Sequence, residues 1–165
     1  MAQGAIVLRS LLPAARIRLF SANGTRLLEA QPEFRWQELQ AGVPYQFGIT
    51  DDTGRSLYET QVDTASLTLP VTVQLRDGGS YTWVVSAKLP DGRKYVSTGV
   101  FSVASADLRA QAMDLRTDVS APVSSRVAYA AWLEQAELKD EARKQWRALA
   151  AERPQDMRLQ ELATQ

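Results

Sequence analysis

Cysteine and histidine are both absent from the 165 residues of this chain. Without cysteine there are no disulfides, thiolate zinc sites or cysteine nucleophiles. Without histidine there are no Ser–His triads, histidine metal clusters or imidazole proton shuttles. The 19 basic residues balance 19 acidic ones, so the net charge is zero and the basic footprint of a general nucleic-acid binder is missing. These absences remove much of the common enzyme repertoire, and we predict a non-enzymatic protein without metal or cofactor.

Long apolar runs are also missing. No stretch of about 18 apolar residues occurs, so no membrane span is predicted. The apolar start of the chain has no Lys or Arg before it and is interrupted by Arg9, which argues against a signal peptide. What remains is ordinary globular composition, with 45% hydrophobic and 23% charged residues. A chain of this length and composition buries a core without metal or disulfide staples.

Alternation of apolar and polar residues dominates residues 1–103. Period-2 patterns rich in aromatic and β-branched residues are typical of half-buried strands. We predict strands around residues 5–12, 33–36, 45–49, 67–69 and 81–87. Asx–Gly turn signals lie between them at residues 22–25, 51–55, 76–79 and 90–93, and Asn23-Gly24 in particular predicts a hairpin turn. Short strands with such turns indicate an antiparallel β-sandwich.

The period changes to that of a helix near residue 104. Helices are predicted over residues 105–117, 125–137 and 139–152, with the start of another over 155–164. Ser105 is the expected cap of the first helix, with Leu108, Ala112 and Leu115 along its apolar face, and Ser124 or Ser125 the expected cap of the second. The fold class is therefore α+β with segregated halves, a sandwich over 1–103 and a helical segment over 104–165.

The first half resembles a fibronectin type III or related immunoglobulin-like domain. The segment Gln31–Trp36 is similar to strand B with its core tryptophan, and Tyr45–Ile49 to strand C. Leu75, six residues before Tyr81, matches the start of a tyrosine corner before strand F. The resemblance implies a sandwich in which Trp36 and Trp83 are core residues.

The second half resembles a tetratricopeptide repeat. Ala130, Ala142, Trp146 and Pro154 match the small, small, aromatic and proline positions of that pattern, while Arg126 stands near the position of its first-helix aromatic. Only one repeat is visible, whereas stacked repeats usually need about three for stability. The hairpin is therefore expected to pack on the sandwich, on a second copy, or on repeats outside this sequence.

These features together predict a protein–protein interaction or assembly module that binds a protein partner or itself through the helical segment. Trp132, Tyr58 and Tyr95 are the candidate partner-binding residues, because exposed aromatics act as recognition anchors. Exposed Tyr58 and Tyr95 would also suit a carbohydrate-binding sandwich. Asp52-Thr53-Gly54 is the tripeptide of aspartic proteases, but the neighbouring Asx–Gly turns favour a hairpin turn there.

Placement in the periplasm or envelope of a bacterium follows from the two resemblances, because such pairings are typical of exported bacterial proteins. Composition alone does not give this placement. A fragment of a membrane-anchored sensor or regulator remains an alternative interpretation.

Overall fold

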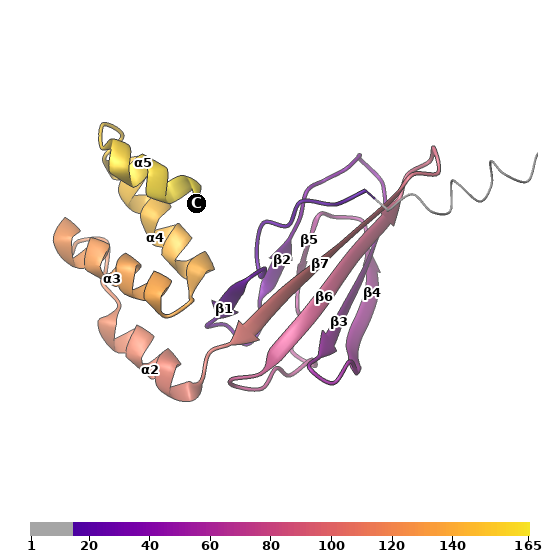
Figure 1. Ribbon diagram of the computed structural model, residues 1–165, viewed down its shortest axis with the longest axis horizontal. Coiled ribbons are helices and arrows are strands. Elements are labelled where there is room, and N and C mark those ends of the chain that lie inside the picture. Colours follow the sequence, from indigo (N-terminus) through magenta and orange to yellow (C-terminus); the bar gives the residue numbers. More distant parts are fainter. Residues whose placement is uncertain (1–14) are drawn as a thin grey trace, which may run out of the picture.

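The computed structural model describes residues 15–165, in which strands occupy the first part and helices the second (Figure 1). The strand predicted over residues 5–12 lies outside the described residues. The last strand ends at Val103 and the first helix begins at Ala106, so the change of period near residue 104 is confirmed. The strands are β1 (Thr25–Leu27), β2 (Glu33–Arg35), β3 (Tyr45–Asp51), β4 (Ser56–Val62), β5 (Ser66–Thr68), β6 (Ser80–Lys88) and β7 (Lys94–Val103).

Two sheets form the sandwich. One has five strands in the order β1-β7-β6-β3-β4, and the other pairs β2 with β5. All neighbours are antiparallel except β1, which runs parallel to β7. The hairpin predicted at Asn23-Gly24 is therefore wrong. Gly24 does take a positive φ of 66°, but it leads the chain back to the edge of β7 instead of joining two antiparallel strands.

A cluster of aromatic rings fills the centre of the core between the sheets. Phe34 from the small sheet lies 5.0 Å from both Phe47 and Trp83 of the large sheet, measured between ring centroids. Trp36 and Trp83 are buried, which confirms their expected place in the core. Trp83 donates its indole N–H to the carbonyl of Ala22 at 2.8 Å, so this large side chain is buried without an unpaired donor.

Tyr81, near the start of β6, forms a hydrogen bond with the turn that precedes this strand. Its hydroxyl accepts a hydrogen bond from the backbone N–H of Arg76 at 2.7 Å, while Leu75 packs against the sandwich core. The predicted tyrosine corner is thus confirmed. The turns at residues 51–55 and 90–93 are also confirmed, as the connections between β3 and β4 and between β6 and β7.

The helices are α2 (Ala106–Leu115), α3 (Val123–Gln135), α4 (Lys139–Glu152) and α5 (Met157–Thr164). Ser105 caps α2 as predicted, since its side chain accepts from the N–H of Leu108. The predicted serine cap of α3 is wrong. That helix starts two residues earlier behind Pro122, whose fixed φ suits a helix entrance and which leaves no side-chain cap.

Helices α3, α4 and α5 pack around their own core. Ala130, Ala142 and Trp146 are buried there, whereas Leu115 is 48% exposed and does not extend the apolar face predicted for α2. Arg126 is only 4% exposed and forms two hydrogen bonds with Glu152 at 2.7 and 2.8 Å. This ion pair ties the start of α3 to the end of α4.

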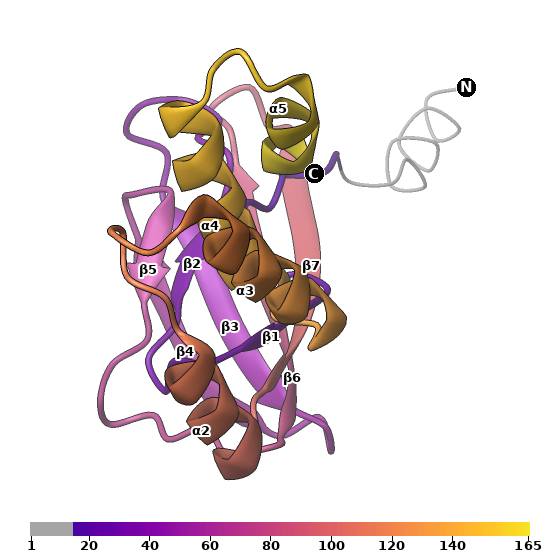
Figure 2. The ribbon, with the colours of Figure 1, turned by 90° about the vertical axis from the view of Figure 1, so that its left-hand side faces the viewer.

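The helices lie beyond one end of the sandwich, next to β1 (Figures 1 and 2). We call the contacts between residues 22–28 and 136–140 the junction. Thr25 Oγ1 accepts hydrogen bonds from the N–H groups of Lys139 at 3.0 Å and Asp140 at 3.3 Å, and the Arg26 N–H donates to Glu137 O at 2.8 Å. The start of α4 is therefore capped by a residue of the sandwich.

Candidate functional site

The three aromatic residues predicted to bind a partner do not form one site. Trp132 is half-buried on α3 and stacks on Tyr129, with centroids 6.2 Å apart and planes inclined by 11°. Tyr58 on β4 and Tyr95 on β7 are both half-buried and pack against the sandwich core. The roles proposed for these residues stay predictions.

Asp52 lies exposed in the turn between β3 and β4, with one carboxylate oxygen 3.7 Å from the Arg76 guanidinium. The neighbouring Asp51 organises this turn, because its buried carboxylate accepts from Thr53 Oγ1 at 2.6 Å and from two backbone N–H groups. The hydrogen bond from Thr53 lowers the pKa of Asp51 in spite of its burial. Both carboxylates thus have the surroundings of turn residues.

A groove of about 220 Å³ runs between the sandwich and helix α4. We call it the junction groove. Its sandwich wall is formed by Phe20 and Ser21, by residues 27–29 and by residues 32, 33 and 35. Its helical wall is one side of α4. The sandwich wall contributes the aromatic ring of Phe20 and the guanidinium of Arg35. The helical wall contributes the positive charges of Arg143, Lys144 and Arg147.

The orientation of the two walls is held by partly buried hydrogen bonds. Asp140 at the start of α4 accepts the N–H of Ala22 at 2.8 Å, and Arg26 donates to the carbonyl of Ala136 at 3.1 Å. Ala22 is fully buried and takes a positive φ of 51°, an uncommon backbone conformation for a residue other than glycine. This conformation persists because the surrounding contacts fix it.

Charges on the helical wall are largely paired. Arg143 contacts Asp140 at 3.1 Å, and Lys144 contacts Glu141 at 2.7 Å. Burial alone would lower the pKa of Lys144, but the hydrogen bond to Glu141 and the nearby negative charges outweigh it and raise that pKa. Lys144 therefore stays charged at neutral pH.

Two arginines of the groove lining, Arg35 and Arg147, and the neighbouring Arg18 outside the lining differ from this pattern. Within residues 15–165 no carboxylate lies within ion-pair distance of Arg18, Arg35 or Arg147. Arg18 lies over the ring of Phe20 at 5.6 Å, and Phe20 is 46% exposed. Among the acidic side chains of the groove lining, Glu33 alone forms no ion pair with residues 15–165. An exposed aromatic ring beside unpaired arginines is typical of protein-binding surfaces.

Sequence reasoning missed this grouping. Arg35 comes from the sandwich and Arg147 from a helix more than a hundred residues later, and no local motif joins them. Only the junction, which sets α4 beside the sandwich, brings them to one groove. No helix among residues 15–165 is long and apolar enough to cross a bilayer.

The strand order defines the class of protein domain. The large sheet places β7, β6, β3 and β4 side by side as the G, F, C and C′ strands of an immunoglobulin-like sandwich, and β2 with β5 stand for B and E. Together with the tyrosine corner, this order shows that the first half is an immunoglobulin-like sandwich.

No protein-family model matches the chain, and no curated protein matches it. Among solved structures, CopC from Methylosinus trichosporium OB3b aligns at 22% identity and a TM-score of 0.38, over 55% of this chain and 95% of its own. The FN5 domain of Drosophila Lar aligns at 15% identity and a TM-score of 0.37, over 56% of this chain and 99% of its own. PorZ, a surface component of the type-IX secretion system of Porphyromonas gingivalis, aligns at 24% identity and a TM-score of 0.35, over 53% of this chain and 11% of its own.

Proposed function

We propose that this chain is a non-enzymatic protein-binding module whose junction groove receives an acidic segment of a partner protein. The observation that carries the proposal is the groove itself, whose walls come from the sandwich and from α4 and are fixed by the junction. A binding surface of fixed shape loses little conformational entropy when a partner binds.

The chemistry of the groove indicates the kind of segment. Phe20 offers an exposed ring for an apolar side chain, and Arg35 and Arg147 of the lining offer two unpaired positive charges against the single unpaired Glu33. Arg18 adds a third positive charge beside the groove, over the Phe20 ring. Guanidinium groups bind carboxylates in bidentate geometry, which favours acidic over neutral partners. The expected segment therefore carries an apolar residue flanked by Asp or Glu.

A labelled peptide with the sequence acetyl-Glu-Glu-Leu-Glu-Glu-amide tests this proposal by fluorescence anisotropy. The peptide should bind saturably, and binding should weaken as salt rises because the groove is open to solvent. The same peptide with Gln in place of each Glu should bind at least roughly tenfold more weakly, a difference of about 1.4 kcal/mol.

Charge reversal locates the site. The double variant Arg35→Glu with Arg147→Glu should lose the binding, whereas Arg158→Glu, an exposed arginine on α5 outside the groove lining, should keep it within about twofold. All three side chains are exposed, so these variants should remain folded. Equal binding of the Glu and Gln peptides, or equal loss in the Arg158 variant, contradicts the proposal.

The finer parts of the assignment belong to the same proposal. We place the module in the bacterial envelope and interpret its helical segment as tetratricopeptide-like, with the sandwich over 1–103 and the helices over 104–165 as its two parts. The burial of Ala130, Ala142 and Trp146 supports the helical interpretation. Fractionation of cells that express the full-length protein tests the location, and recovery with the cytosolic proteins contradicts it.

A further inference from the structure

A second feature lies on the outer edge of β7, between its pairings with Ala15 and with Gly24. The backbone groups of alternate residues of β7 face this edge. Near its start, Lys94 O and Val96 N pair with Ala15, and further along Val100 O accepts from Gly24 at 2.7 Å. Because the register with β6 is regular throughout, the N–H and C=O of Thr98 face the same edge as those of Val96 and Val100.

The pairing is interrupted between these two points by one side chain. In a continued parallel ladder, Ile17 would bond to the carbonyl of Val96 and to the N–H of Thr98. Instead, Ser97 Oγ accepts from Ile17 N at 2.8 Å and donates to Ile17 O at 2.6 Å. Among the described residues, the backbone N–H of Thr98 and the C=O of Val96 have no partner on this edge.

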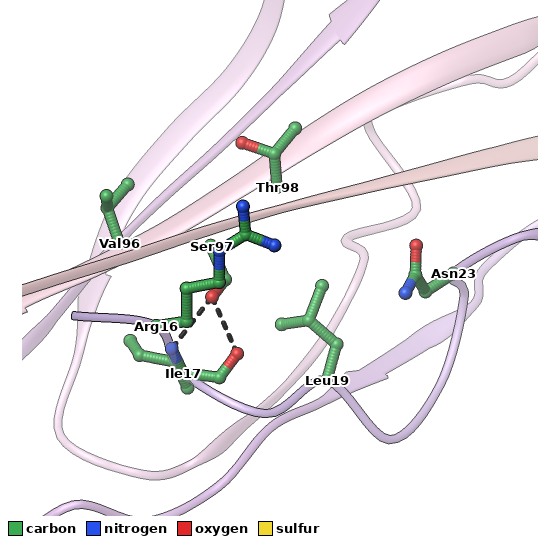
Figure 3. A pocket seen from close by; sticks show the side chains of 7 residues that line it. All are labelled: Arg16, Ile17, Leu19, Asn23, Val96, Ser97 and Thr98. Atoms are coloured by element: carbon green, nitrogen blue, oxygen red, sulfur yellow. Dashed lines mark hydrogen bonds between the residues drawn. The ribbon is translucent and has the colours of Figure 1, made fainter. Parts of the chain in front are cut away.

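The interruption opens a pocket of about 550 Å³ (Figure 3). Its lining holds the half-buried Leu19 and the buried Ile17 as apolar residues and Arg16, Asn23 and Thr98 as polar groups, and it includes no acidic residue. In Figure 3 the side chain of Arg16 extends along β7 towards Thr98. No residue of 15–165 forms an ion pair or a side-chain hydrogen bond with Arg16 or with the Asn23 amide.

We propose that this pocket binds a carboxylate carried on an extended peptide. The guanidinium of Arg16 pairs with the carboxylate, and the free edge groups of Val96 and Thr98 bond to the peptide backbone. This combination of strand addition and charge pairing uses the donors and the acceptor that the chain leaves unpaired. The site is separate from the junction groove, so it does not depend on the function proposed above.

Amide NMR spectra of the full chain titrated with three short peptides test the proposal. The probes are acetyl-Val-Val with a free terminal carboxylate, acetyl-Val-Asp-Val-amide with a side-chain carboxylate, and acetyl-Val-Val-amide with none. The first two should shift the amide signals of Thr98 and Asn23, and the third should bind at least roughly tenfold more weakly. The stronger of the first two identifies the source of the carboxylate.

Two variants separate this site from the groove. Arg16→Gln should weaken carboxylate binding at least about tenfold, whereas Arg18→Gln, two residues away and outside the pocket lining, should leave it within about twofold. The groove variant with Glu at 35 and 147 should also leave it unchanged. Equal shifts with all three peptides, no shift at Thr98 or Asn23, or no effect of Arg16→Gln would overturn the inference.

Discussion

Replacing Thr25 with valine tests whether the sandwich stabilises α4. Thr25 is 5% exposed, and its hydroxyl oxygen accepts from the first two N–H groups of the helix. Leu138, which precedes α4, provides no side-chain cap of its own. Valine has nearly the same shape as threonine and lacks the hydroxyl, so Thr25→Val removes the cap and leaves the packing in place.

The expected loss follows from the capping role. Removing a threonine cap costs about 1–2 kcal/mol, and the upper end applies here because both N–H groups are partly buried and lose their acceptor. Urea unfolding followed by tryptophan fluorescence should show this loss as a lower midpoint at unchanged slope. Thr82→Val on the outer face of β6, where the hydroxyl forms no hydrogen bond with residues 15–165, should change stability by less than about 0.5 kcal/mol.

Hydrogen exchange adds a local measurement. The amides of Lys139 and Asp140 should exchange faster in the Thr25 variant, because the acceptor of their hydrogen bonds is gone. A Thr25→Val protein as stable as the parent, with unchanged exchange at these amides, would refute capping of α4 by the sandwich.

Three further changes have defined outcomes. Tyr81→Phe breaks the tyrosine corner and should cost about 1 kcal/mol in urea unfolding. Gly99→Ala places a methyl group 2.7 Å from Cε2 of Trp83 and should cost about 1–3 kcal/mol, visible as a shifted tryptophan emission and a lower midpoint. The hydrogen bond from Arg126 lowers the pKa of Glu152, so the pair stabilises the fold at neutral pH and this stability is lost as pH falls through the lowered pKa. Glu152→Gln should therefore destabilise the protein at neutral pH but not at strongly acidic pH.

Much of the sandwich was predictable because its signals are local. Alternation located β3 and β6, and Asx–Gly pairs located the turns that join antiparallel neighbours. The same rule failed at Asn23-Gly24, where a similar Asx–Gly signal returns the chain to β7 in a parallel pairing. A turn motif specifies the local dihedral angles, but contacts with the core determine which strand the following residues pair with. Here the Trp83 indole N–H binds the carbonyl of Ala22 and holds the chain beside the core just before β1.

The candidate sites were less predictable, because both depend on contacts between distant segments. No pattern near Ser97 indicates that its hydroxyl bonds to Ile17, eighty positions earlier, and so holds the chain off the edge of β7. The sequence around Thr25 likewise gives no sign that this residue caps a helix, because the helix that it caps begins at Lys139. Sequence patterns identify caps and ladders only when both partners are neighbours in the chain.

The junction also stabilises one end of the helical segment. A solenoid needs capping at its ends, because each helical pair buries its apolar face only against a neighbour. Here Leu28 from the sandwich packs on the helical core, and Thr25 supplies the acceptor that α4 lacks, so the sandwich covers one end of the helical segment. At the other end, α5 begins with an exposed apolar residue, Met157, which is 73% exposed. Any further helix that joins this chain should therefore pack on α5, the end that the sandwich does not cover.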